Sequence, residues 1–229
     1  MSVILNIDTA IDEANISISK NGGIIAQLSN NEQNKQAGFL QPAIQSLLKN
    51  ASVSIQELAA IAISAGPGSY TGLRVGMASA KGLCYALNKP LITIGTLEIM
   101  AYAAILETHN DVLSSSVLFC PMIDARRMEV FTALYDKHLE PVSSPAAIIL
   151  DENFLANSLL KNKILFFGNG AKKWELICRH ENAAFIAAST NSLAMSKLAY
   201  KKYKQQDFAD LAYTEPLYLK EFFSGPKKI

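Results

Sequence analysis

The order of strand-like and helix-like segments is the feature that most constrains the fold of this 229-residue chain. Three segments rich in β-branched residues open the sequence, and from residue 39 the apolar spacing becomes that of helices alternating with buried strands. After residue 116 the same order returns, although the two stretches are not visibly similar in sequence. This repetition indicates a duplicated unit of three strands followed by helix, strand, helix, strand and helix.

The pattern predicts two α/β halves. In the first half we predict strands at 3–7, 14–19, 24–28, 59–64 and 91–94, and helices at 39–51, 72–87 and 97–107. In the second half we predict strands at 117–123, 128–135, 146–150, 164–167 and 184–187, and helices at 152–160, 171–179 and 193–204. Two mixed sheets flanked by helices, facing each other, make the actin-like (ASKHA, hexokinase-like) architecture.

The polar, serine-rich segment 108–116 is the best linker candidate. We therefore divide the chain into an N-terminal actin-like half, 1–108, with partner-binding helices, and a C-terminal actin-like half, 109–229. The last helix or the tail of the second half can return to the first half. The tail from residue 207 onward is expected to be extended.

Composition restricts the function. A formal net charge of +1 argues against a dedicated nucleic-acid binder, which normally carries a strongly basic face, so any RNA contact should be local or indirect. No secretion signal is visible, and the apolar stretches fall far short of the roughly 20 residues that cross a bilayer. We expect a cytoplasmic protein with no membrane partner. Cys84, Cys120 and Cys178 are far apart and odd in number, which favours buried, inert thiols.

The most informative motif is GPGSYTGLRVG, residues 66–76, between a buried strand and a long helix. A dinucleotide fingerprint needs a third glycine where this chain has Thr71. A Walker A loop needs a lysine where Leu73 follows Gly72. Both phosphate-loop interpretations therefore fail.

The structural interpretation of the motif is a tight turn. Gly66 and Gly68 would supply unusual backbone angles and Pro67 would fix φ. Ser69 or Thr71 would cap the helix that follows.

That helix, 72–87, has more apolar circumference than a sheet can cover. Beside its main apolar arc lies a second arc of small residues, namely Gly72, Val75, Ser79, Gly82 and Ala86. An ordinary surface helix needs an apolar stripe of roughly 100°, and this helix carries about twice that. Two interpretations remain open: the helix 39–51 covers the second arc within the same half, or the two helices form a shared face that docks a second protein.

These residues resemble the TsaB (YeaZ) family. GPGSYTGLRVG closely matches the signature loop and helix of that family, and ILNIDTA, LQPAIQSLL, IDARRMEVF and EPLYLK extend the match over nearly the whole chain. The signature loop consists of Gly66, Pro67, Gly68, Ser69, Tyr70, Thr71 and Gly72. The chain departs from the family at Gln36-Ala37, where the family often has a histidine-serine pair. That departure puts in doubt any role assigned to the pair.

The resemblance implies participation in making N6-threonylcarbamoyladenosine (t6A) in tRNAs that read codons beginning with adenine. TsaB-like proteins form a heterodimer with the related catalytic subunit TsaD, the ATPase TsaE joins that pair, and free TsaB can self-associate through the same helical face. The chain would then be a non-catalytic scaffold or activator that meets tRNA indirectly, has no intrinsic cofactor, and meets ATP or ADP only in the complex. Carried over by position, the partner interface consists of Leu40, Ile44, Leu47, Val75, Ser79, Gly82 and Ala86.

The competing interpretation is an enzyme of the same architecture, either an ATP-dependent phosphotransferase or a metal-dependent enzyme. TsaD-like proteins carry a HxxxH pair whose side chains share one helix face and can bind one metal. The matching region here, 95–104, contains no histidine, and His109, His138 and His180 share no ligand spacing. We expect no metal site and no catalytic residue.

Actin-like kinases hold phosphates in the turn between the first two strands of each half, using glycine beside an aspartate. The corresponding turns here, 8–12 and 124–127, contain no glycine, and Asp12 adds a second carboxylate where phosphate charge would lie. Asp8 could cap its turn or orient a metal, and we favour the cap.

Overall fold

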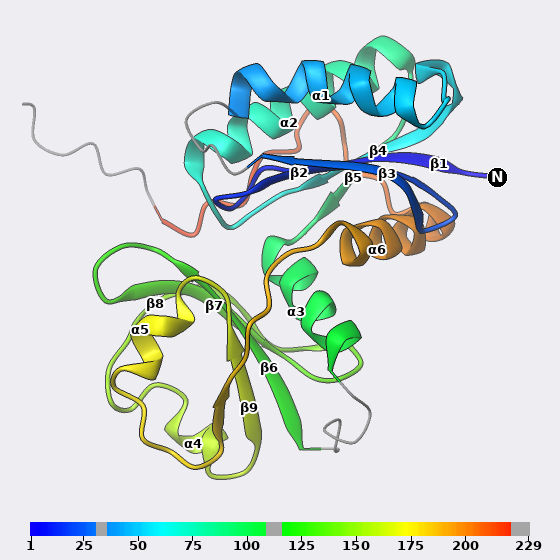
Figure 1. Cartoon of the computed structure of the whole chain (residues 1–229). Coiled ribbons are helices and arrows are strands. Elements are labelled where there is room, and N and C mark those ends of the chain that lie inside the picture. The colour runs from blue at the N-terminus through cyan, green and yellow to red at the C-terminus, as the bar shows by residue number, and fades with distance from the viewer. Residues whose placement is uncertain (31–35, 109–115, 221–229) are drawn as a thin grey trace, which may run out of the picture.

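The computed structural model describes residues 1–30, 36–108 and 116–220, and it consists of two α/β halves, each with a mixed five-stranded sheet (Figure 1). The predicted fold class is confirmed. The predicted linker, 108–116, lies almost entirely outside the described residues, as do His109 and the side chains of Gln36 and Ala37.

The first sheet has the strand order β3-β2-β1-β4-β5. Its strands are β1 (Val3–Asp8), β2 (Ala14–Lys20), β3 (Gly23–Asn30), β4 (Leu58–Ser64) and β5 (Leu91–Ile94). β1 pairs antiparallel with β2 and parallel with β4, so the sheet is mixed. Helices α1 (Gln36–Asn50) and α2 (Tyr70–Leu87) cover one face, and α6 (Ser192–Gln205) covers the other (Figure 1). A short 3-10 helix, η2 (Ile55–Glu57), precedes β4.

The second sheet repeats this arrangement in the order β10-β9-β6-β7-β8. Its strands are β6 (Val117–Asp124), β7 (Glu129–Tyr135), β8 (Pro141–Ile149), β9 (Lys163–Phe167) and β10 (Ala183–Phe185). Helices α4 (Ala156–Leu159) and α5 (Ala171–Glu175) contribute Leu159 and Trp174 to the core on one face. Helix α3 (Thr96–Glu107) packs on the other face, against β6 and β7. The element order of the two halves is the same, as the sequence predicted.

The last helix of each half crosses to the sheet of the other half. Although α6 follows β10, it packs on β1, β2, β3 and β5, while α3 follows β5 and packs on β6. Apolar side chains alternate along β1, so Ile4 faces α6 while Leu5 and Ile7 face α1 and α2. Asn6 shares the α6 side, and its amide nitrogen lies 3.2 Å from Oγ of Ser196 on that helix.

The elements of the second half differ most from those predicted. The helix predicted at 152–160 is reduced to α4, because Leu155 adopts a left-handed conformation with φ of 56°. The helix predicted at 171–179 ends as α5 at Glu175, and the guanidinium of Arg179 donates to three carbonyls at that end. β8 begins at Pro141, earlier than predicted, because an edge strand tolerates proline.

In the first half the main difference concerns α1. It begins three residues earlier than predicted, which places Pro42 in its second turn, at an exposed position. An exposed carbonyl left without its helical partner can bind water there.

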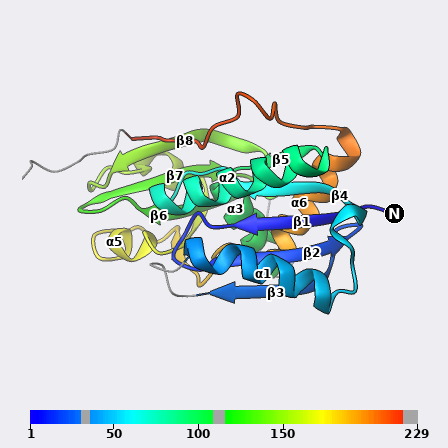
Figure 2. The same ribbon diagram turned by 90° about the horizontal axis from the view of Figure 1, so that it is seen from above.

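The C-terminal segment, 207–220, runs back from the end of α6 along the β5 side of the first sheet (Figure 2). Ala209 forms a bridge with Leu91 of β5, and the amide of Leu217 donates to the carbonyl of Ala65 at 2.7 Å. Lys81 of α2 donates to the carbonyls of Ala212 and Thr214. The segment is therefore attached to α2 and to the signature loop.

Candidate protein-interaction site and interdomain cleft

The signature loop lies directly on the turn between β1 and β2. The amide of Ser69 donates to the carbonyl of Ala10 at 2.6 Å. A Cβ atom added at Gly68 would lie 2.1 Å from the same oxygen, so only glycine allows this approach. The loop backbone is thus bonded to the turn that would hold phosphate in an actin-like kinase.

The other members of the loop position the helix and the C-terminal segment. Gly66 has φ of +104°, and a Cβ there would lie 2.7 Å from the carbonyl oxygen of Leu217. Its own carbonyl accepts the amide of Thr96 at 2.9 Å. Ser69 caps α2 by accepting the amide of Gly72 at 3.3 Å. These contacts support the tight-turn interpretation of the motif.

Helix α2 is held against β1 by a close approach at Gly76. A Cβ at Gly76 would lie 2.3 Å from Oγ1 of Thr9 and 2.9 Å from Cδ1 of Ile63. The hydroxyl of Thr9 donates to the carbonyl of Gly72 at 2.8 Å. Neither the motif nor the helical spacing indicated this contact, because Thr9 is distant from Gly76 in the sequence.

The predicted interface residues of α1 face inward. Leu40, Ile44 and Leu47 are 1–2% exposed and belong to the core between helices α1 and α2 and the first sheet. We therefore correct their assignment: the apolar spacing of α1 marks the face that packs on β2 and β3, and these side chains cannot contact a partner while that packing holds. The exposed residues of α1 among those described are Gly38, Gln41, Pro42, Gln45, Ser46, Lys49 and Asn50.

The predicted interface residues of α2 lie at the surface. Val75 and Ser79 are half-buried, whereas Gly82 and Ala86 are exposed. A Cβ at Gly82 would meet no atom within 4 Å. Together with the exposed Ala78 they form a surface that we call the α2 strip: Val75, Ala78, Ser79, Gly82 and Ala86.

Two neighbours bound the α2 strip. On one side α1 packs against α2, and Val75 and Leu83 join the core cluster that contains Leu47. On the other side lies the C-terminal segment, whose Tyr218 hydroxyl lies 3.3 Å from Nε of Arg74 on α2. The guanidinium of Arg74 also lies over the ring of Tyr70 on the same helix, 4.1 Å from the ring centroid. Helix α1 therefore covers one edge of the second arc and leaves its middle open. Docking of a second protein on the open part stays a prediction.

The cleft between the halves is small. Its pocket has a volume of about 120 Å³ and is lined by Ile11, Asp12, Glu13, Met100, Asn169 and Ser189. The side chain of Asn169 spans the cleft, because its Nδ2 donates to Asp12 at 3.2 Å and its Oδ1 accepts the amide of Asp124 at 2.8 Å. Sites for drug-sized ligands usually measure about 300–1,000 Å³. This pocket is smaller than such sites.

Asp8 lies at the end of β1, next to this cleft, and is 2% exposed. Burial raises the pKa of its carboxyl, against the opposing effect of hydroxyl groups on Ser64 and Thr190. Its Oδ1 accepts the amide of Ala10 at 3.1 Å, which is the arrangement of a turn cap. Within the described residues, no group of three potential metal ligands is present.

Asp124 occupies the corresponding position at the end of β6. Partial burial opposes ionisation, but Lys173 at 2.7 Å and the amide of Arg126 at 2.6 Å outweigh it and lower the pKa of Asp124. Its carboxylate is thereby committed to protein groups.

Comparison with known proteins gives the family. The family model described as TsaD, tRNA N6-adenosine threonylcarbamoyltransferase, matches residues 7–220. The tRNA threonylcarbamoyladenosine biosynthesis protein TsaB of Bacillus subtilis is 30% identical over 226 residues, which cover 95% of this chain and 93% of that protein. The chain belongs to the TsaB family. TsaB of Haemophilus influenzae, 26% identical with the same coverage of both chains, extends the likeness.

One TsaD sequence aligns with less of the chain than these two TsaB sequences do. The tRNA N6-adenosine threonylcarbamoyltransferase of Staphylococcus haemolyticus is 34% identical over 122 residues, which cover 46% of this chain and 36% of that enzyme. YeaZ from Pseudomonas aeruginosa has the same fold, with a TM-score of 0.79 and 22% identity over 96% of this chain and all of that chain. A putative N-acetylmannosamine kinase from Listeria monocytogenes shares the fold at a TM-score of 0.51 and 12% identity, over 90% of this chain and 99% of that one. None of the described helices is both long enough and apolar enough to cross a membrane.

Proposed function

We propose that this member of the TsaB family is the accessory subunit of a t6A-forming complex and that it binds TsaD through the α2 strip and the outer face of α1. Membership of the TsaB family supports a role in t6A biosynthesis. The exposed strip of small side chains on α2 supports the choice of partner surface.

The α2 strip has the properties of a helix-docking surface. Its central residue, Gly82, leaves open space above the backbone, and its neighbours Ala78 and Ala86 are small. Small side chains let the backbone of a second helix approach closely, which increases the van der Waals contact area. Glycine weakens a helix by roughly 1 kcal/mol relative to alanine, so the stability of α2 does not explain why glycine occupies position 82.

The cleft supports an accessory role rather than an enzymatic one. The turn after β1 is bonded to the signature loop through Ala10, the cleft pocket is smaller than ligand sites usually are, and Asp8 is enclosed by protein groups. ATP or ADP would then bind only in the complex with TsaD. A phosphotransferase would need the loop to leave the turn and the halves to separate.

The same surface limits how the subunits can assemble. Two copies of the chain that pair through the α2 strip cannot bind TsaD with it at the same time, so homodimer and heterodimer exclude each other. In this proposal TsaE joins through the heterodimer.

Reconstitution with purified components tests this role. TsaD, TsaE, ATP, threonylcarbamoyl donor and an unmodified tRNA are combined with and without the chain, and t6A is measured by mass spectrometry. We expect t6A only when the chain is present, and no phosphate release from ATP by the chain alone. Equal t6A without the chain, or ATP hydrolysis by the chain alone, would contradict the accessory role.

The interface needs a substitution that leaves the fold intact. Val75→Glu would introduce a charge at a half-buried side chain of the core cluster, and this would mix a folding defect with a binding defect. Gly82→Glu places the charge in open space instead. Gln205→Glu, at an exposed position in α6 on the opposite face of the sheet, adds the same charge as a matched control.

A further inference from the structure

The turn between β6 and β7 holds two consecutive arginines in a backbone conformation that arginine rarely adopts. φ is 70° at Arg126 and 49° at Arg127. In this left-handed region the Cβ atom of any residue other than glycine crowds a carbonyl oxygen. Asn-Gly and similar pairs adopt the conformation readily and are the common choice in hairpin turns. Local turn geometry therefore does not explain why arginine stands at both positions.

The turn is held firmly in this shape. Oδ1 of Asp124 accepts the amide of Arg126 at 2.6 Å, and the amide of Ala125 donates to the carbonyl of Glu129 at 3.0 Å. The amide of Glu129 donates to the carbonyl of Arg126 at 3.1 Å. We call residues 124–129 the arginine turn.

The carboxylates of the arginine turn are already engaged by lysines. Lys173 forms an ion pair with Asp124, and Lys220 forms an ion pair with Glu129. Both arginine side chains are exposed, and neither has a hydrogen bond or ion pair to another described residue. Arg126 and Arg127 therefore place two positive charges side by side on a chain whose formal net charge is only +1.

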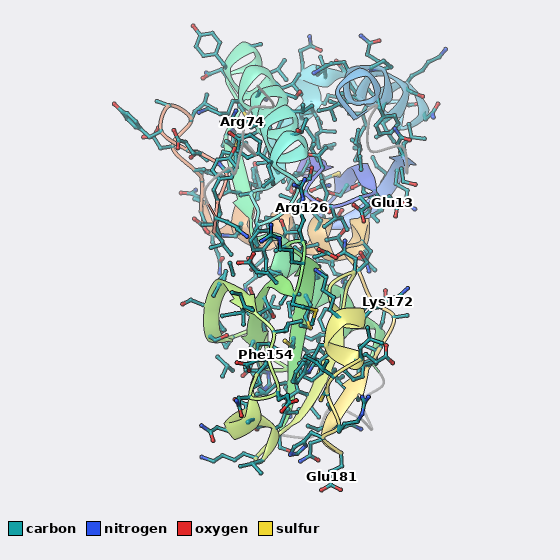
Figure 3. All side chains as sticks on the ribbon, turned by 90° about the vertical axis from the view of Figure 1, so that its left-hand side faces the viewer. Glu13, Arg74, Arg126, Phe154, Lys172 and Glu181 are labelled. Atoms are coloured by element: carbon teal, nitrogen blue, oxygen red, sulfur yellow. The ribbon has the colours of Figure 1, made fainter. Side chains whose placement is uncertain are left out.

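The chain has only two other arginines, and both are engaged within the protein. Arg74 contacts Tyr70 and Tyr218, and Arg179 donates to carbonyls at the end of its own helix. Arg126 lies where the two halves meet, below Arg74 (Figure 3). Neither Arg126 nor Arg127 lines the cleft pocket, and both are exposed, so a ligand of the arginine turn would bind at the outer surface.

We propose that Arg126 and Arg127 form a binding site for backbone phosphates of RNA. A guanidinium presents a planar set of N–H donors that matches phosphate oxygens, and it is always charged. The side chains of Arg126 and Arg127 are exposed on a turn whose backbone is fixed. Nucleic-acid contacts are more positively charged than protein interfaces. The inference rests on the proposed function in one respect: the RNA is the tRNA substrate of the complex. It adds a direct contact where the sequence indicated only an indirect one.

The test is RNA binding by the heterodimer with TsaD, measured by fluorescence anisotropy of an unmodified tRNA transcript between about 50 and 200 mM salt. The variant combines Arg126→Asn with Arg127→Gly, which restores residues that favour the turn. We expect the Kd for RNA to rise at least about tenfold, because hydrogen bonds to charged groups are lost. The slope of log K against log salt should decrease in magnitude by about 1.4 to 1.8, the value for two phosphate contacts.

Two controls separate this site from other causes. The pair Lys197→Gln and Lys201→Gln removes the same charge from exposed positions on α6 and should leave the Kd and the slope unchanged. The melting temperature of the arginine variant should equal or exceed that of the wild type, because strain is relieved. An arginine variant that is less stable than the wild type would show that the arginines serve the fold.

Three further results would overturn the proposal. They are an unchanged Kd and slope in the arginine variant, an equal loss in the lysine control, and a parallel loss of TsaD binding by the arginine variant. If the wild-type chain fails to bind TsaD, the proposed function fails. The same titration on the chain alone then tests the arginine turn separately.

Discussion

Helix α2 contains two glycines whose replacement by alanine should have opposite effects on stability. At Gly82 the added methyl group meets open space, so the substitution should stabilise the protein by about 1 kcal/mol through helix propensity. At Gly76 the same propensity gain is opposed by contacts of 2.3 Å to Thr9 and 2.9 Å to Ile63. Overpacking of this kind costs about 1–3 kcal/mol or more.

In the Gly76→Ala protein, displacement of the Thr9 side chain would also break a hydrogen bond. Its hydroxyl donates to the carbonyl of Gly72, and loss of such a bond costs about 0.5–1.5 kcal/mol. We therefore expect Gly76→Ala to destabilise the protein by about 1–3 kcal/mol net. A shift of 1 kcal/mol corresponds to about 2–4 °C in melting temperature for a chain of this size.

Urea unfolding followed by circular dichroism measures both variants. The midpoint should rise for Gly82→Ala and fall for Gly76→Ala, with no change in the slope m. A Gly76→Ala protein at least as stable as the wild type would refute the close packing of α2 on the β1 turn. A Gly82→Ala protein that loses stability would refute the open strip.

Other expected outcomes follow from buried groups and from the C-terminal segment. Because burial raises the pKa of Asp8, its ionisation opposes folding, so the wild type should lose stability relative to Asp8→Asn as pH rises above about 4; parallel unfolding curves of the two proteins across pH would contradict this. Burial also raises the pKa values of Cys84 and Cys120 to about 12, so a thiol reagent at pH 8 should label Cys178 first in the native protein, and rapid labelling of all three would refute the packing. Lys81→Met removes two contacts to the C-terminal segment, so it should lower stability by about 1 kcal/mol and speed proteolysis after residue 206. Unchanged stability and proteolysis would show that these contacts do not hold the segment.

The sequence predicted the architecture because apolar spacing is a local property. Strands such as β1 and β4 and helix α2 follow directly from their periodicity, and the repeated order of elements indicated the duplication. Helices α4 and α5 of the second half are shorter than predicted. The left-handed residue Leu155, which begins α4, depends on packing that the spacing of apolar residues does not reveal.

The candidate site was only partly predictable. The excess apolar circumference of α2 predicted side chains that the sheet does not cover, because helix geometry fixes which residues share a face. Gly82 and Ala86 are indeed exposed, while their role in binding a partner stays a prediction. The same reasoning failed for Leu40, Ile44 and Leu47, since the apolar face of an amphipathic helix is the one that its own core buries. The left-handed conformation of the arginine turn accompanies a hydrogen bond that the Asp124 carboxylate accepts from the amide of Arg126, which is visible only in three dimensions.

The binding constant between this chain and TsaD, measured by calorimetry for three proteins, tests the account most directly. We expect the wild type and Gln205→Glu to bind TsaD with the same Kd. Gly82→Glu should bind at least about a hundredfold more weakly, because an unpaired charge would be buried in the interface, while its melting temperature stays at or above that of the wild type. A stable Gly82→Glu protein that binds TsaD with the wild-type Kd would contradict the assignment of the α2 strip as the partner surface.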